Sequence, residues 1–128
     1  MRQRALAALA AVTIGVLSAQ QPAPKTETVV ITFHARPGAE SELARVIEKH
    51  WNVAREMKLV NDAPHLTLRG TEEGDRVRFT DIFTWREAES PDHAPPAIQA
   101  IWAEMGRLVE SRGGKAGIEI AEGEIVSR

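Results

Sequence analysis

The pattern of apolar residues constrains the fold most, because its period changes in the same order twice along the chain. Residues 28–34 alternate like a β-branched strand, and the turn at 36–38 leads into a stretch whose apolar residues recur three and four positions apart. Residues 77–85 repeat the strand pattern, and a proline-rich turn then leads into a second helical stretch. A strand followed by a helix, twice over, predicts an α+β domain.

The two helical stretches are predicted near residues 39–57 and 96–112. Pro95-Pro96 suits a helix start, and Gly113-Gly114 suits a helix stop. Each helix has one apolar stripe that predicts burial against a sheet. The stripes are Leu43, Val46, Ile47, His50, Trp51, Ala54 and Met57 in the first helix, and Ile98, Ile101, Trp102, Met105, Leu108 and Val109 in the second.

Two further strands complete the predicted sheet. Residues 66–69 can pair with the strand at 77–85 across the turn at 71–75, and residues 117–126 close the chain. The order is then βαββαβ, a ferredoxin-like, four-stranded antiparallel sheet with two helices on one face. The other face carries Val30 and Ile82, and soluble proteins seldom expose such a patch. We therefore expect a homodimer that pairs through this face.

The N-terminus has the features of an export signal. Two arginines precede a mostly apolar, uncharged run at residues 5–17, which ends at the small residues Ser18-Ala19. Spanning a bilayer needs about 20 apolar residues, so a retained anchor is the less favoured alternative. We expect a signal peptide at 1–19, a linker at 20–27, a domain at 28–128, and a periplasmic or secreted protein without a stable membrane anchor after cleavage.

The charge of the chain argues against a nucleic-acid partner. Without residues 1–19, 14 Lys and Arg remain against 18 Asp and Glu, and the basic residues are interleaved with acidic ones. Proteins that bind nucleic acids generally gather basic residues on one face. The chain has no cysteine, so packing and not disulfide bonds must stabilise it.

Three short motifs resemble a known family. They are Phe33-His-Ala-Arg-Pro-Gly38, Phe83-Thr-Trp85 at a strand end, and His93 before the second helix. Together they resemble the antibiotic biosynthesis monooxygenase-like domain of the dimeric α+β barrel superfamily, over residues 28–126. The resemblance implies a dimeric barrel with a pocket in each protomer. It also implies a small hydrophobic or aromatic partner and no cofactor, because some members oxygenate aromatic or quinol substrates without metal or flavin.

His93 and Asp81 are the candidate catalytic residues. His93 matches the family's histidine before the second helix, where an imidazole could hydrogen-bond a substrate or take a proton. The alternative is that His93 only orders the proline-rich turn. Asp81 lies between Phe79 and Phe83 on an apolar strand face, where an unpartnered carboxylate is costly. We expect a partner such as an arginine, or a bulge that turns Asp81 outward, with a catalytic base as the third alternative.

Four more residues are candidates for substrate binding: Trp85, Trp102, Phe83 and His34. Trp85 matches the strand-end aromatic residue of the family. The first expectation for Trp51, Trp102 and Trp85 is burial in the core. The alternatives are that Trp51 and Trp102 form one wall of a cavity and that Trp85 is a stacking surface for a flat ligand. The four histidines are scattered and have no cysteine nearby, so no metal site is expected.

The sequence leaves two functions open. The first is an exported small-molecule pocket protein, acting as a cofactor-independent oxygenase in which His93 helps to deprotonate an aromatic or quinol substrate. The second is a non-catalytic module that binds a hydrophobic ligand in the cell envelope. The chain has no tyrosine and few polar residues on its strands, which leaves an enzyme short of groups that handle protons.

Overall fold

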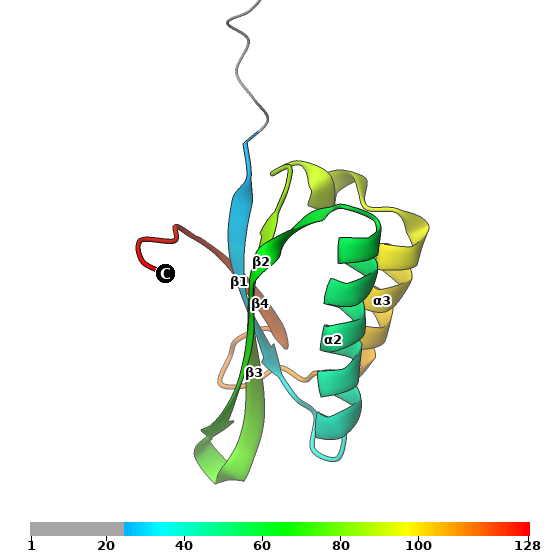
Figure 1. Ribbon diagram of the computed structural model, residues 1–128. Helices are drawn as coiled ribbons and strands as arrows, with labels where there is room; N and C mark the ends of the chain where they lie inside the picture. Colours follow the sequence, from blue (N-terminus) through cyan, green and yellow to red (C-terminus); the bar gives the residue numbers. More distant parts are fainter. Residues whose placement is uncertain (1–24) are drawn as a thin grey trace, which may run out of the picture.

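The computed structural model describes residues 25–128, so the predicted signal at 1–19 and most of the predicted linker lie outside the described residues. The elements follow the predicted order (Figure 1). They are β1 (Glu27–His34), α2 (Glu40–Glu56), β2 (Val60–Glu72), the 3₁₀ turn η1 (Glu73–Asp75), β3 (Arg76–Trp85), the 3₁₀ turn η2 (Ser90–His93), α3 (Pro96–Arg107) and β4 (Ile118–Gly123). β1 begins at Glu27, one residue before the predicted start of the strand at 28.

The four strands form one antiparallel sheet in the order β2-β3-β1-β4. Both helices cover the same face of this sheet, as Figure 1 shows. The register places Phe33 opposite Phe79 and Val30 opposite Ile82, so alternate residues of β1 and β3 face the helices. The predicted ferredoxin-like α+β fold is therefore confirmed.

The core lies between the helices and the sheet. Phe33, Phe83, Leu43, Ile47 and Ile98 are fully buried in it. Each large apolar side chain contributes about 1.5–3 kcal/mol when it leaves water. The predicted stripe of α2 is buried up to Ala54, whereas Met57 is 42% exposed because the helix ends at Glu56.

Helix α3 ends five residues before the predicted position. The chain leaves the helix so that Val109 can form an antiparallel bridge with Ala35 at the end of β1. Two backbone hydrogen bonds secure this path, from Arg36 N to the Leu108 carbonyl at 2.9 Å and from Glu110 N to the His34 carbonyl at 3.0 Å. The prediction of a helix to residue 112 is wrong because these contacts satisfy backbone groups that a longer helix would have bonded.

Gly113 and Gly114 form a turn and not the helix stop that was predicted. Their φ angles are 60° and 78°, a region that glycine enters without steric cost. The turn is closed by a bridge between Arg112 and Lys115. It brings the chain back to β4, which is shorter than the predicted strand at 117–126.

The sheet face away from the helices has exposed apolar side chains, as predicted. Leu66 and Leu68 of β2 are 50% and 51% exposed there. Val30 and Ile82 pair across the middle of the same face and are half-buried. We call this surface the open face.

Candidate functional site

An apolar cavity of about 390 Å³ lies on the helix side of the sheet. Trp85 at the end of β3 and Trp102 on α3 both line it, and their role in substrate binding stays a prediction. The remaining lining residues are Glu27, Val29, Ile31, Pro91, Ile118 and Ile120. Since Glu27 is the one ionisable side chain among them, the cavity suits a flat apolar molecule.

Phe83 does not line this cavity but lies behind its wall. Its ring is fully buried and meets the ring of Trp85 edge-on, with centroids 5.1 Å apart. Phe83 therefore supports the ring of Trp85 from behind. It does not line the cavity, so it is not placed to touch a bound molecule.

The sequence did not single out His50, which holds Trp102 from behind. The Trp102 indole Nε1 donates a hydrogen bond to His50 Nε2 at 2.9 Å. Burial, and then the charge of His65, lowers the pKa of His50 to about 4. The imidazole is therefore neutral at pH 7, which leaves Nε2 free to accept. The sequence offered one signal for this contact: the apolar stripe of α2 contains a histidine, and the apolar stripe of α3 contains a tryptophan.

Asp81 lies fully buried on the helix-facing side of β3. The register of β3 against β1 is continuous there, so no bulge turns the carboxylate outward. Its partners are His65, with Nε2 3.1 Å from Asp81 Oδ1, and the Thr67 hydroxyl, which donates to the same oxygen at 2.8 Å. Asp81 therefore has the kind of partner that the sequence predicted, but the partners are a histidine and a threonine and not an arginine.

Burial raises the pKa of Asp81, and the contacts with Thr67 and His65 only partly oppose that effect. His65 in turn stacks on Trp51, with parallel rings and centroids 4.2 Å apart. Asp81 is not among the residues that line the apolar cavity. Its contacts join β2, β3 and α2, and a catalytic role for it stays a prediction.

His93 is exposed at the end of η2. Pro91, two residues earlier in the same turn, lines the apolar cavity, but His93 does not. The structure therefore brings Trp85 and Trp102 together at one cavity without His93 or Asp81. The catalytic role of His93 also stays a prediction.

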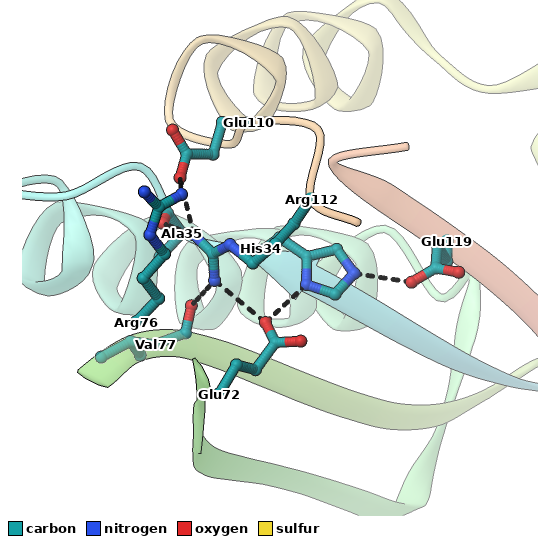
Figure 2. Close-up of polar contacts among 8 residues, drawn as sticks. All are labelled: His34, Ala35, Glu72, Arg76, Val77, Glu110, Arg112 and Glu119. Carbon is teal, nitrogen blue, oxygen red and sulfur yellow. Dashed lines mark hydrogen bonds and ion pairs between the residues drawn. The ribbon is translucent and has the colours of Figure 1, made fainter. Parts of the chain in front are cut away.

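His34 lies on the open face, away from the two tryptophans, within a cluster of charged residues at one end of the sheet (Figure 2). The ring is 3% exposed. His34 Nδ1 lies 2.7 Å from a Glu72 oxygen, and Nε2 lies 2.6 Å from a Glu119 oxygen. Because a carboxylate oxygen already lies within hydrogen-bond distance of each ring nitrogen, neither nitrogen is free for a ligand.

Arg112 is the centre of the same cluster, and the sequence did not reveal it. Nη1 donates to Glu72 at 2.9 Å and to the Val77 carbonyl at 3.1 Å. Nη2 donates to the Ala35 carbonyl at 2.6 Å and to Glu110 at 2.9 Å. Arg112 thus ties the loop after α3 to β1 and β3, as Figure 2 shows.

The electrostatics of this charged cluster favour mutual pairing over ligand binding. Burial acts to raise the pKa of Glu72, but hydrogen bonds from His34 and Arg112 outweigh it and lower that pKa. A polar cavity of about 520 Å³ adjoins the cluster and has both acidic and basic side chains in its lining. We therefore interpret the cluster (His34, Glu72, Glu110, Arg112 and Glu119) as a structural clamp.

Among residues 25–128, no three or more His, Cys, Asp or Glu side chains are arranged so that they could hold a metal ion. Nor does any helix in the same range have the length and apolar character to cross a membrane.

Known proteins resemble this chain in structure and not in sequence. No protein-family model matches the sequence, and no curated protein matches it. SnoaB of Streptomyces nogalater, a cofactor-independent oxygenase whose N63A variant was solved, superimposes with a TM-score of 0.59 at 16% identity. The match covers 80% of this chain and 95% of SnoaB.

Two other solved structures give the same result. Rv0793 of Mycobacterium tuberculosis has a TM-score of 0.58 at 14% identity, over 81% of this chain and 98% of its own. A Chloroflexus aurantiacus protein, proposed to be an antibiotic biosynthesis monooxygenase, has a TM-score of 0.58 at 16% identity. The match covers 81% of this chain and 96% of that protein. The chain therefore has the fold of antibiotic biosynthesis monooxygenase-like proteins, as its motifs predicted.

Proposed function

We propose that this protein binds a small, flat, aromatic or quinol molecule in the apolar cavity beside Trp85 and Trp102. The observation that carries the proposal is the lining of that cavity, which combines two indole rings with aliphatic side chains from β1 and β4. Indole rings offer large flat surfaces on which an aromatic ring can stack. The volume of about 390 Å³ lies within the range of small-molecule sites.

Binding can be tested with anthrone, a flat tricyclic ketone, by following the quenching of tryptophan fluorescence. Ile120 lines the cavity and is 68% exposed, so Ile120→Glu should fold while placing a charge at the cavity. We expect this change to weaken anthrone binding by about tenfold or more. Val126→Glu is the matched control, since Val126 is 90% exposed and does not line the cavity. Equal weakening by both changes would contradict the proposal.

The proposed activity is oxygenation of the bound molecule without a cofactor, which the shared fold with SnoaB supports. With anthrone, a base removes a proton from the methylene carbon, and the resulting carbanion reduces dioxygen. One oxygen atom becomes the new carbonyl of anthraquinone, and the other leaves as water. Two residues are proposed as the base: His93, in the turn that includes the cavity residue Pro91, and Glu27, which lines the cavity itself.

Oxygen uptake with anthrone separates these alternatives. Loss of uptake in His93→Ala with retained binding would assign the proton transfer to His93, and the same result in Glu27→Gln would assign it to Glu27. Unchanged uptake in both variants would discard both roles. Saturable binding without uptake in the wild type would favour the second candidate function, a non-catalytic binding module. The absence of His93 and Asp81 from the cavity lining supports that candidate.

We also propose that two copies pair through their open faces. The half-exposed Leu66 and Leu68 support this, because a monomer would leave them in water. Sedimentation of Leu68→Glu should show a shift from dimer to monomer, whereas a monomeric wild type would contradict the proposal.

Export remains part of the proposal as well, and mass spectrometry of the protein after expression in bacteria would show whether residues 1–19 are removed.

A further inference from the structure

We infer that His50 is a positioning residue for the apolar cavity, because its neutral imidazole accepts the Trp102 indole N–H and fixes that ring as a cavity wall. The inference rests on the proposed function of the cavity as a ligand site. It assigns to His50 no contact with the bound molecule.

The geometry places His50 behind both tryptophans of the cavity. His50 lies on α2 and is 2% exposed, while Trp102 lies on α3 and is half-buried at the cavity. The bond of 2.9 Å between them joins the two helices. The His50 ring also meets the ring of Trp85 nearly at a right angle, with centroids 6.1 Å apart. One side chain therefore contacts both indole walls.

The direction of the bond fixes the protonation of His50. An indole N–H can only donate, so His50 Nε2 must carry a lone pair and the proton must be on Nδ1. The titratable group that acts on His50 from the adjoining sheet is His65 of β2, which is itself bonded to Asp81 of β3. Its remaining ring neighbours, Phe83, Trp85 and Trp102, have no titrating group.

The bond also determines what Trp102 offers to a ligand. The single indole donor is used by His50, so Trp102 presents its ring and not a hydrogen-bond donor to the cavity. Without His50, the N–H would be left unsatisfied beside an apolar core, and the ring would rotate to find a partner. His50 thus keeps the wall flat and apolar, which favours aromatic ligands without a need for donors.

The test uses ¹⁵N-labelled full-length protein, in which Trp102→Phe identifies the Trp102 indole resonance. We expect His50→Leu to move this resonance upfield and to weaken naphthalene binding by about tenfold. His50→Gln is the conservative control, since its side-chain oxygen can occupy the position of Nε2. We expect it to restore the resonance and bring affinity to within about threefold of the wild type.

A second measurement needs no variant that could fail to fold. In the wild type, the Trp102 indole resonance should titrate with a midpoint at about pH 4, because a protonated Nε2 cannot accept. An unchanged resonance in His50→Leu, or a flat titration through that range, would overturn the inference. A wild type that binds no naphthalene would count against the proposed function, whereas the resonance would still decide the role of His50.

Discussion

The two buried histidines, His34 and His50, have nearly the same exposure and very different surroundings. His34 lies between two carboxylates on the open face, with one carboxylate oxygen within hydrogen-bond distance of each ring nitrogen. His50 lies among aromatic rings on the helix side and accepts from an indole. The comparison shows that burial does not determine what a histidine does in this fold. Its partners do, and they separate a structural clamp from a ligand cavity.

Removing Arg112 should have the largest effect on stability. Arg112→Met removes the side-chain donor of the buried Ala35 carbonyl, leaves the Val77 carbonyl with only the Ala35 N–H, and takes one hydrogen-bond donor from each of Glu72 and Glu110. We expect the free energy of unfolding to fall by about 3–5 kcal/mol, measured by urea denaturation. Arg107→Met is the control, because Arg107 is exposed, and it should cost no more than about 0.5 kcal/mol. Similar losses in both variants would show that no clamp exists.

Acid should destabilise the protein through His50. The unfolded chain takes up a proton near pH 6.5, whereas folded His50 resists protonation down to about pH 4. The unfolded state therefore binds more protons in this interval, and stability falls as the pH falls, by about 3 kcal/mol in total. The lowered pKa of Glu72 gives a further loss, but only below pH 4.5.

Urea denaturation between pH 7 and pH 4.5 checks the assignment to His50. The slope of stability against pH should be reduced in His50→Gln, because the glutamine side chain does not titrate. A slope that matches the wild type would assign the acid sensitivity to another group.

Changes to partly exposed ion pairs should have the smallest effects. Glu119→Gln weakens one of the two carboxylate contacts of His34, and the Glu119 side chain is 36% exposed, so we expect the free energy of unfolding to fall by about 1 kcal/mol. Lys49 pairs with Glu104 between the helices in a more exposed setting, and Lys49→Met should change stability by less than about 0.5 kcal/mol. A larger loss of stability in Lys49→Met than in Glu119→Gln would show that burial does not strengthen the contact between His34 and Glu119.

The sequence predicted the fold because periodicity is a local signal. The start of α3 at Pro96, the hairpin between β2 and β3, and the exposed apolar side chains of the open face all follow from short patterns. Short patterns also place Trp85 at a strand end and Trp102 on the apolar stripe of α3, but the cavity that both residues line forms only in the folded chain.

The partners of Asp81 and His34 could not be predicted in the same way. His65 and Thr67 lie beside Asp81 because the β2–β3 hairpin pairs Thr67 with Asp81 and His65 with Phe83, a register that the turn sets and the apolar pattern alone does not show. The charged cluster joins residues from β1, β2, β4 and the loop after α3, up to 85 positions apart. Such contacts depend on the path of the loop, and that path depends on where α3 ends.

The most direct test is a crystal structure of the protein soaked with anthrone. We predict that the molecule lies in the apolar cavity, with its rings against Trp85 and Trp102, and that the Trp102 indole still donates to His50. Anthrone bound instead in the polar cavity beside His34 and Arg112 would contradict the division of the protein into a clamp and a ligand site.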